Sequence, residues 1–411
     1  MRVLIVGGSG RMGGVIAWDL LRDNEVEVVG IADRQSSILQ MAQKGINSNK
    51  LIVHVLDVTD REKTRRLMRE YDVGVISLAD RKANYMAVEA AIDAGLNTVD
   101  ILEDYHRRPD PSGAEALQVP GQMTPDEYGE WLHKRAMEND VLLLDGLGFA
   151  PGLSNITLGD GIRKMDKAES AIARVGGIPA KEASGKYPLN YMITWAFDHV
   201  LREYMVQVEV IKNGKVQQVP ALSDRESFRF TGLGRDEELE CAVTRGMPSY
   251  IFTRRQLSEF AEKTIRWPGH YEGIDRLKEC GMLDLTPVEF EGMRIAPRDF
   301  LSSVMSPKLA PSEGDTDVCI MWNTVIGTEN GKKMRIDYYM WEEADKENGI
   351  SAMGRVTGFP AAIGARLVAR GEIRKKGIVA PEDAIEGEVY RGFLDELRKR
   401  NITIREVPES G

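Results

Sequence analysis

A chain of 411 residues is long enough for two or more domains, each with a hydrophobic core of its own. Its formal net charge is −10 at pH 7, and the scattered Lys and Arg argue against a nucleic-acid-binding surface. No apolar run approaches the ~20 residues that span a bilayer, and no leader sequence opens the chain, so we predict a cytoplasmic protein without a membrane segment. Three cysteines, far apart and odd in number, form neither a disulfide framework nor a metal site, so we predict reduced thiols and no metal.

The chain opens with a strand and a glycine-rich turn. Residues 3–6 are a continuous apolar run, typical of a parallel strand buried on both faces. Residues 8–13 follow as G-x-G-x-x-G and can equally be read as glycines at 7, 10 and 13. Glycines let the backbone approach a pyrophosphate, and the N-terminus of the following helix supplies N–H donors. The expected cofactor contacts here are Gly8, Ser9, Gly10, Arg11 and Met12.

A second strand, within residues 26–33, ends at Asp33. This position lies about twenty residues past the last glycine of the motif, as in the dinucleotide fingerprint. A carboxylate at this position accepts the ribose hydroxyls of NAD and repels the 2′-phosphate of NADP. The neighbouring Arg34 could instead bind that phosphate or stack on the adenine. We therefore predict NAD as the cofactor and leave NADP open.

Strands and helices continue to alternate up to about residue 150. Strands are expected within 51–60, 73–79, 97–102 and 141–147, and helices within 61–71 and 84–95. This pattern predicts an α/β, Rossmann-type domain over residues 1–150, a doubly wound parallel sheet with its ligand at the carboxyl ends of the strands. Further cofactor contacts expected at those ends are Asp57, Val58, Ser77, Leu78 and Ala79.

A polar, proline-containing segment interrupts the alternation between the last two predicted strands. Residues 103–131 read as a long surface loop that contains His106. It could be a lid, an interface arm or an insertion without a function. Near its end, Thr124 and Pro125 have the residue types of an N-cap and a first helical position.

The pattern changes after Asn155. Alternating apolar and polar residues flank Asn213-Gly214 and again Asn330-Gly331, and Asn-Gly is a strong hairpin signal. We predict an inserted α+β domain over residues 151–345, built on a mostly antiparallel sheet. A C-terminal segment, 346–411, is expected to return to the first domain with a helix that has Pro360 in its first turn.

Several motifs, in this order along the chain, resemble the saccharopine dehydrogenase family and most of all its lysine 6-dehydrogenase branch. Besides the glycine-rich turn they are "AAIDAGLNTVDI", "GFAPGLSN", "YPLNYMITW", "IRWPGH" and "TGFPAAIGARLV". The resemblance implies a Rossmann domain, a substrate domain whose sheet forms a homodimer interface, and a small-molecule amino-acid substrate. It further implies NAD-dependent oxidative deamination of the lysine ε-amine to the semialdehyde or cyclic imine.

Two other functions remain open. One is a saccharopine- or carboxyspermidine-type reductase, which condenses an amine with an aldehyde or keto acid, and the other is a non-catalytic nucleotide-binding scaffold. Saccharopine reductases carry Asp-Pro-Gly where this chain has Ala150-Pro151-Gly152, which favours the lysine branch. The long loop after Ile101 departs from that branch and leaves the substrate open.

The segment Gly148–Asn155 leaves the last predicted strand of the first domain on the cofactor side. We expect it to form a wall of the hydride-transfer site and a hinge, with Phe149 and Gly152 against the cofactor. Ser154 or Asn155 would cap the helix that follows. The alternative is a tight turn between domains without ligand contact.

Removal of a hydride next to nitrogen requires a neutral amine, so the site needs a proton acceptor. Of the five histidines, His270 and His199 lie in segments that the family places near the substrate, and His270 is the preferred base; it could instead be hydrogen-bonded in a turn. Arg266 is the predicted partner of the substrate α-carboxylate, because a guanidinium binds two carboxylate oxygens at once. Further predicted substrate contacts are Tyr191, Thr194, Trp195 and Thr357.

Overall fold

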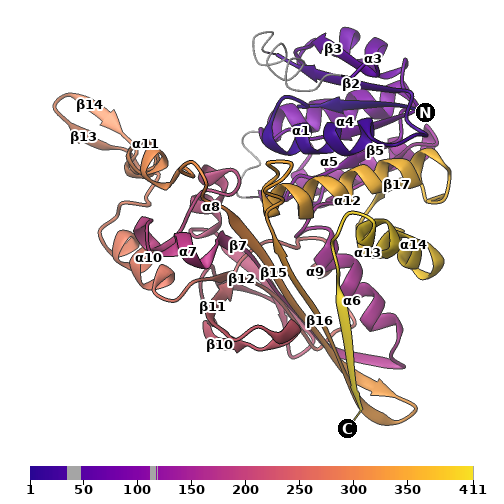
Figure 1. Cartoon of the computed structure of the whole chain (residues 1–411). Coiled ribbons are helices and arrows are strands. Elements are labelled where there is room, and N and C mark those ends of the chain that lie inside the picture. Colours follow the sequence, from indigo (N-terminus) through magenta and orange to yellow (C-terminus); the bar gives the residue numbers. More distant parts are fainter. Residues whose placement is uncertain (35–47, 112–116, 118, 411) are drawn as a thin grey trace. The chain divides into compact units, whose positions relative to one another are not determined.

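The computed structural model describes residues 1–34, 48–111, 117 and 119–410 (Figure 1). The chain forms two compact units. The first comprises Met1–Asp160, Met247–Thr253 and Gly354–Ile402, and the second comprises Gly161–Gly246, Arg254–Met353 and Thr403–Gly411. Each unit is therefore assembled from segments that are far apart in the sequence.

The first unit contains a seven-stranded parallel sheet, which confirms the predicted Rossmann-type fold class. Its strand order is β17-β6-β5-β4-β1-β2-β3, and the inner strands β1 and β4 are almost entirely buried. The strands are β1 (Arg2–Val6), β2 (Val28–Asp33), β3 (Leu51–Val55), β4 (Val73–Ile76), β5 (Thr98–Asp100), β6 (Leu142–Leu144) and β17 (Gly377–Val379). Five of these strands fall within predicted ones and β1 begins one residue before its predicted range, whereas β17 was not predicted.

Helices accompany this sheet in the Rossmann manner (Figure 1). They are α1 (Arg11–Leu21), α3 (Arg61–Met68), α4 (Arg81–Ala94), α5 (Pro125–Glu138), α9 (Tyr250–Thr253), α12 (Ala352–Ala369), α13 (Pro381–Ala384) and α14 (Gly387–Arg398). Helix α6 (Leu153–Arg163) begins in the first unit and ends in the second, and α12 begins in the second unit and ends in the first. The predicted N-cap at Thr124 and first helical position at Pro125 of α5 are confirmed. Thr124 also forms a capping box with Glu127, because the side chain of each accepts the backbone N–H of the other.

The second unit contains a nine-stranded, mostly antiparallel sheet, in which only the β12–β7 pair is parallel. The main path is β10-β11-β12-β7-β15-β16-β18, with β8 on β12 and β9 on β8. The strands are β7 (Lys167–Pro179), β8 (Gln207–Lys212), β9 (Lys215–Pro220), β10 (Glu226–Phe230), β11 (Glu237–Val243), β12 (Glu259–Arg266), β15 (Asp317–Glu329), β16 (Lys332–Glu343) and β18 (Arg405–Ser410). Both predicted Asn-Gly hairpins are confirmed, since Asn213, Gly214, Asn330 and Gly331 all have positive φ.

The remaining elements of the second unit flank this sheet. They are α7 (Lys181–Ser184), α8 (Phe197–Glu203), α10 (His270–Glu279), α11 (Pro297–Leu309), two short 3₁₀ turns, and a separate hairpin of β13 (Val288–Phe290) and β14 (Met293–Ile295). Figure 1 shows this hairpin extending from α11. Across the described residues, none of the helices combines the length and the apolar character needed to cross a membrane.

Helix α12 begins earlier than the sequence predicts. It starts at Ala352, so Pro360 lies in its interior rather than in its first turn. The carboxylate of Asp317, on β15, accepts the backbone N–H groups of Ala352 (2.7 Å) and Met353 (2.9 Å). A residue distant in sequence therefore caps the helix, and a search of the local sequence for an N-cap could not find this start.

Candidate functional site

The glycine-rich turn of the first unit lies at the point where the strand order reverses. Strand β1 is flanked by β2 on one side and β4 on the other, and the chain leaves β1 directly into this turn. Ligands of doubly wound sheets bind outside the carboxyl ends of the strands at such a switch point. The fold therefore brings the sequence-predicted turn to the place where a dinucleotide fits.

The glycines of this turn are required by close backbone packing. Gly7 has φ +84°, and a Cβ on it would overlap the carbonyl of Ser77. A Cβ on Gly13 would overlap the carbonyl of Gly7, and one on Gly8 would lie 2.8 Å from the side chain of Ile31. The turn is thus packed against β2 and the end of β4. Gly13 contacts both Gly7 and Gly8, so both readings of the motif are compatible with this packing.

The N-terminus of α1 is available to an anion. Gly10 is its N-cap, and among the described residues no side chain caps the helix and no acidic residue lies in its first turn. Gly10 and Arg11 are exposed, and Ser9 and Met12 are half-buried. Backbone N–H groups and the positive end of the helix dipole are the features that the predicted phosphate site requires, and binding there stays a prediction.

The predicted ribose side of the site lies at the end of β2. Asp33 accepts a hydrogen bond from the hydroxyl of Ser9, which links the acidic residue to the glycine-rich turn. Arg34 is exposed. Asp57, after β3, accepts bonds from the backbone N–H (2.9 Å) and hydroxyl (2.8 Å) of Thr59, which lower the pKa of Asp57, and Val58 is buried.

The end of β4 forms the other wall of the turn. The Ser77 N–H donates to the Val6 carbonyl (2.8 Å), Ser77 and Leu78 are half-buried, and Ala79 is exposed. Asp80 then caps α4 by accepting the N–H of Ala83. The predicted contacts on β1, β2 and β4 therefore surround one edge of the sheet.

The segment Gly148–Asn155 is a closed backbone turn. The Gly148 N–H donates to the Pro151 carbonyl (2.9 Å), and the Gly152 N–H donates to Oδ1 of Asn155 (2.9 Å). Gly152 has φ +131°, and a Cβ on it would overlap the backbone of Gly148. Glycine at 152 is thus required by the turn itself, so contact with a cofactor is not needed to explain it.

Thr357 lies against this turn, and Phe149, within it, is buried. A Cβ on Gly148 would be 3.1 Å from Cγ2 of Thr357. Thr357 and Gly358 both lie inside α12, because this helix begins at Ala352 and not near Pro360. Gly358 instead allows close packing of α12 on α1, since its Cβ would lie 2.8 Å from Cγ1 of Val15.

A buried carboxylate holds the start of α6 in place. Glu382 accepts bonds from Nδ2 of Asn155 (2.9 Å) and from the hydroxyls of Ser249 (2.8 Å) and Thr253 (2.6 Å). These contacts join residues 247–253 to the first unit. The prediction that Ser154 or Asn155 is the N-cap of this helix is wrong, because α6 begins at Leu153 and contains both residues. Asn155, its third residue, instead accepts the Gly152 N–H and donates to Glu382.

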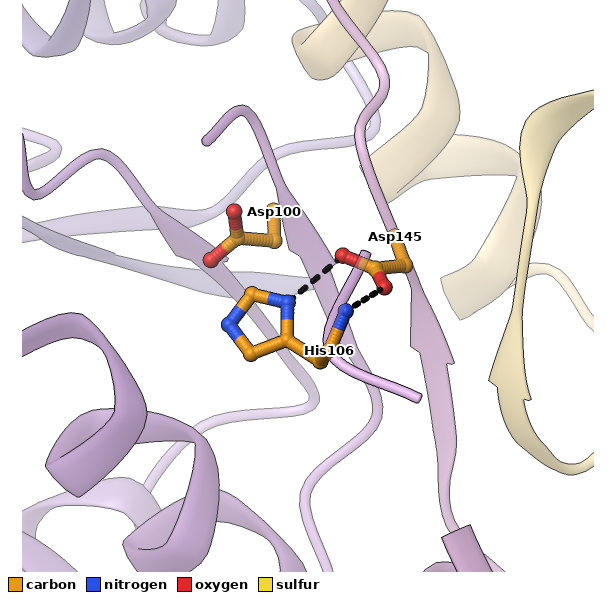
Figure 2. A group of neighbouring side chains, drawn as sticks. All are labelled: Asp100, His106 and Asp145. Atoms are coloured by element: carbon orange, nitrogen blue, oxygen red, sulfur yellow. Dashed lines mark hydrogen bonds and ion pairs between the residues drawn. The ribbon is translucent and has the colours of Figure 1, made fainter. Parts of the chain in front are cut away.

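A second buried polar cluster lies at the carboxyl ends of β5 and β6 (Figure 2). His106 is fully buried; its Nδ1 and backbone N–H lie 2.7 and 2.8 Å from the two carboxylate oxygens of Asp145. Its Nε2 lies 2.7 Å from Oδ1 of Asn84, and the Nδ2 of Asn84 donates to Asp100 (2.8 Å). Asp100, His106 and Asp145 are residue types that bind metals, but both ring nitrogens of His106 already have protein partners.

This cluster corrects the prediction of a surface loop after residue 102. Tyr105, His106 and Asp110 are buried, although the segment lacks an apolar pattern. The available signal was the pair Asp100 and Asp145. Each follows a buried strand directly, and neighbouring parallel strands bring their carboxyl ends to one edge.

The second unit contains a buried cation, Arg266, at the end of β12. It is 4% exposed. Its Nε donates to the hydroxyl of Tyr204 (3.0 Å), its Nη1 donates to the Ile265 carbonyl (3.0 Å), and the guanidinium lies over the ring of Tyr191 (5.2 Å). Within the described part of the chain, no carboxylate forms an ion pair with it.

The predicted base His270 belongs to the same cluster and is 1% exposed. Its Nδ1 lies 3.0 Å from the Leu189 carbonyl, which can only accept, so Nδ1 carries the proton and Nε2 accepts from Tyr204 (3.0 Å). Burial and the charge of Arg266 lower the pKa of His270 to about 3. The ring is neutral and weakly basic near pH 7, and its catalytic role stays a prediction.

The other predicted substrate residues of the second unit have different surroundings. Thr194 is buried, its hydroxyl has no hydrogen-bond partner within the described residues, and it lies near Gly177 of β7. Trp195 and His199 are half-buried, and their rings pack edge to face with centroids 6.0 Å apart. Tyr191 is the predicted pocket residue that meets Arg266 and His270.

Glu262 was not found from the sequence. It lies four residues before Arg266 on β12, and therefore on the same face of the strand. Its carboxylate accepts bonds from the Thr244 hydroxyl (2.7 Å) and the Gly246 N–H (2.9 Å), and burial raises its pKa to about 7. In the sequence it is one of many glutamates, and only its burial distinguishes it.

Two family models together match nearly the whole chain. Residues 3–146 match the saccharopine dehydrogenase NADP binding domain, and residues 148–402 match the saccharopine dehydrogenase C-terminal domain. The chain belongs to the saccharopine dehydrogenase family. This membership confirms the predicted family and a nicotinamide dinucleotide cofactor, with NADP as an open choice.

Similar proteins are distant in sequence. The mitochondrial alpha-aminoadipic semialdehyde synthase of Bos taurus is 24% identical over 97% of this chain, which spans about half (47%) of that protein. The carboxyaminopropylagmatine dehydrogenase of Synechocystis is 21% identical over 93% of this chain and 92% of its own length. A solved structure of saccharopine dehydrogenase (L-Glu forming) from Saccharomyces cerevisiae covers 99% of both chains with a TM-score of 0.77 and 19% identity, which shows the shared fold. The lysine branch, the homodimer and the cytoplasmic location stay predictions.

Substitution of Gly152 tests the turn. Because a Cβ would overlap the Gly148 backbone at a positive φ, we expect Gly152→Ala to lower the free energy of unfolding by about 1–3 kcal/mol. Gly392→Ala is the control: this exposed helical glycine has no atom within 4 Å of an added Cβ, and alanine should stabilise α14 slightly. Chemical denaturation measures both. An unchanged stability together with a lost affinity for the dinucleotide would instead identify Gly152 as a cofactor contact.

Proposed function

We propose that the protein transfers a hydride between a nicotinamide dinucleotide and the carbon of a CH–NH group in a substrate that carries a carboxylate. The main support in the second unit is Arg266, a buried guanidinium without a carboxylate partner among the described residues. A buried unpaired charge is costly, and a substrate carboxylate would offset that cost with two parallel hydrogen bonds. The glycine-rich turn and the uncapped α1 terminus support the cofactor half of the proposal.

The residues of the first unit would position the cofactor. The backbone N–H groups at the start of α1 would bind its pyrophosphate, and Asp33 would accept its ribose hydroxyls. A nicotinamide dinucleotide held there would supply the acceptor for a hydride from the substrate carbon next to nitrogen. Water would then split the resulting substrate imine into a carbonyl compound and an amine or ammonia. The chain must supply the proton acceptor that makes the substrate amine neutral first.

The preferred substrate is lysine, oxidised at its ε-carbon, as the resemblance to the lysine branch implies and as Ala150, in place of an aspartate, favours. The second candidate is a secondary amine that joins two amino-acid skeletons or an amino acid to a polyamine. The names of the yeast and Synechocystis relatives favour this second candidate. It is also supported by Thr194, whose buried hydroxyl lacks a partner among the described residues and could bind a further polar group of a larger substrate.

An assay of both directions distinguishes these functions. Formation of NADH or NADPH is followed with lysine, saccharopine and carboxyalkyl polyamines, and oxidation of the reduced cofactor is followed with keto acids or aldehydes plus an amine. Turnover with lysine alone supports the first candidate, and turnover with secondary amines supports the second. Cofactor binding without turnover on any of these compounds would instead support the non-catalytic scaffold.

Asp33 is expected to determine the choice of dinucleotide. Its carboxylate would repel the 2′-phosphate of NADP, so the native protein should have the higher kcat/KM with NAD, and Asp33→Ala should narrow that preference. Kinetics with both cofactors at a saturating substrate concentration measure the ratio. Equal or better use of NADP by the native protein would contradict the assignment and point to Arg34 as the phosphate partner.

Arg266→Lys keeps the positive charge but loses the bidentate hydrogen bonding of a guanidinium to a carboxylate. We expect KM for the substrate to rise by a factor that corresponds to roughly 1–3 kcal/mol, with little change in the cofactor KM. Arg276→Lys, an exposed arginine on α10, is the matched control and should leave both KM values unchanged. Thermal unfolding checks that both variants are folded. A native substrate KM in Arg266→Lys would place this residue outside the binding site.

The pH dependence should identify the proton acceptor. Glu262 accepts a proton only when ionised, and its pKa is raised to about 7, so kcat/KM should rise as the pH increases through about 7. Glu262→Gln should remove this ascending limb, whereas His270→Gln should retain it because the pKa of His270 is lowered to about 3. Loss of the limb in His270→Gln alone would restore His270 as the base predicted from the sequence.

A further inference from the structure

The cluster around His106 lies at the edge of the sheet where the dinucleotide is proposed to bind. It joins the ends of three neighbouring strands: Leu78 follows β4, Asp100 ends β5 and Asp145 follows β6. All of these residues belong to the first unit. Leu78 is one of the predicted cofactor contacts, so the cluster reaches the edge where the dinucleotide is proposed to bind.

We infer that His106, held between Asp145 and Asn84, is a positioning residue that fixes the turn after β4 for dinucleotide binding. The inference rests on the proposed function, because it assumes a dinucleotide at this edge. In this inference, His106 contacts neither the glycine-rich turn nor the cofactor. Its action passes through the side chain of Asn84.

The hydrogen-bond inventory determines how the amide of Asn84 is oriented. One amide atom lies 2.8 Å from Oδ2 of Asp100 and 3.4 Å from the Leu78 carbonyl. Both of these oxygens are acceptors, so the atom between them is the NH₂ group. The amide oxygen therefore faces Nε2 of His106 (2.7 Å), and this nitrogen must carry a proton.

The other ring nitrogen of His106 also carries a proton. Nδ1 lies 2.7 Å from Oδ1 of Asp145, while Oδ2 of Asp145 accepts the backbone N–H of His106 (2.8 Å). A ring with two donors is an imidazolium cation. Burial alone would lower the pKa of His106, but the charge and hydrogen bond of Asp145, followed by the charges of Asp100 and Asp104, raise it to about 9.

Charged and titratable groups from each neighbouring element face this cation. Besides Asp145 and Asp100, they are Asp104 on the same loop and Tyr85 and Arg81 on α4. The Tyr85 ring lies 4.3 Å from the imidazole, between centroids, and its hydroxyl donates to Asp104 (2.8 Å). Burial raises the pKa of Asp100 to about 6 and that of Tyr85 well above its usual range, so His106 is the member whose charge changes near pH 9.

Loss of the positive charge of His106 would affect the turn after β4 through Asn84. A neutral ring keeps one proton, so it can donate to Asp145 or to Asn84, but not to both. If Asn84 loses its donor, its amide can rotate and place an oxygen against the Leu78 carbonyl and the Asp100 carboxylate. Two acceptors at that distance repel, and the turn from Ser77 to Leu78, which packs on Gly7, would shift.

Direct titration of the dinucleotide over pH 7–10, above the pKa of about 6 of Asp100, tests this inference. The native protein should bind the reduced cofactor with constant affinity up to about pH 8 and weaken as the pH rises through about 9, since the charged ring is the competent form. His106→Gln offers a donor to one partner only and carries no charge. It should bind about tenfold more weakly at pH 7 and lack the change near pH 9.

Two further variants complete the test. His54→Gln is the matched control: this histidine of β3, in the same unit, bonds the hydroxyl of Tyr71 (2.6 Å), and the variant should keep native affinity and pH profile. Asn84→Asp places a second oxygen where the NH₂ group was, and it should weaken binding as His106→Gln does. Circular dichroism and thermal unfolding identify the folded variants.

The outcomes separate the inference from the proposed function. A native protein that binds neither NAD(H) nor NADP(H) overturns the proposed function, and the inference with it. A native protein that binds without any change near pH 9 overturns the inference alone, whether or not His106→Gln folds. A folded His106→Gln with native affinity and profile does the same, whereas weaker binding at equal stability supports the positioning role.

Discussion

The contact between Gly7 and the carbonyl of Ser77 is the constraint on which the candidate cofactor site depends. It occurs because parallel strands β1 and β4 are neighbours and the chain reverses its direction of winding between them. Any side chain at position 7 would separate the turn from β4, and a positive φ is required there as well. Once this contact is made, the N-terminus of α1, the end of β2 and the end of β4 must lie at one edge of the sheet.

Features that depend on residues close together in the sequence could be predicted from it. The apolar runs of β1 and β4, the glycines at 7 and 13, and the Asn-Gly turns each act over a few residues, so their pattern identifies the structure directly. The same is true of the spacing that leads from the glycine-rich turn to Asp33. The residues predicted at the ends of β1, β2 and β4 do lie at one edge of the sheet, and their contact with a cofactor stays a prediction.

Features fixed by partners distant in sequence were not predictable. The start of α12 depends on Asp317, thirty-five residues earlier, and Pro360 alone suggested a later start. The loop around His106 lacks an apolar pattern because its buried groups are polar and are satisfied by Asp145 and Asn84. His270 illustrates the remaining limit: its place beside Arg266 followed from the motif, but the burial that makes it a weak base did not.

Two of the buried cations, His106 in the first unit and Arg266 in the second, differ in how their charge is compensated. His106 faces the carboxylate of Asp145 at 2.7 Å, so its charge is neutralised within the protein and serves to orient Asn84. Arg266 is surrounded by tyrosine rings and hydroxyls, which spread its charge without cancelling it. A buried cation that already has a counter-ion in the protein is not stabilised further by a ligand carboxylate. A buried cation without a counter-ion regains from that carboxylate much of the electrostatic stabilisation that it lost on leaving water. This difference is the physical reason to assign a structural charge to the first unit and a substrate-binding charge to the second.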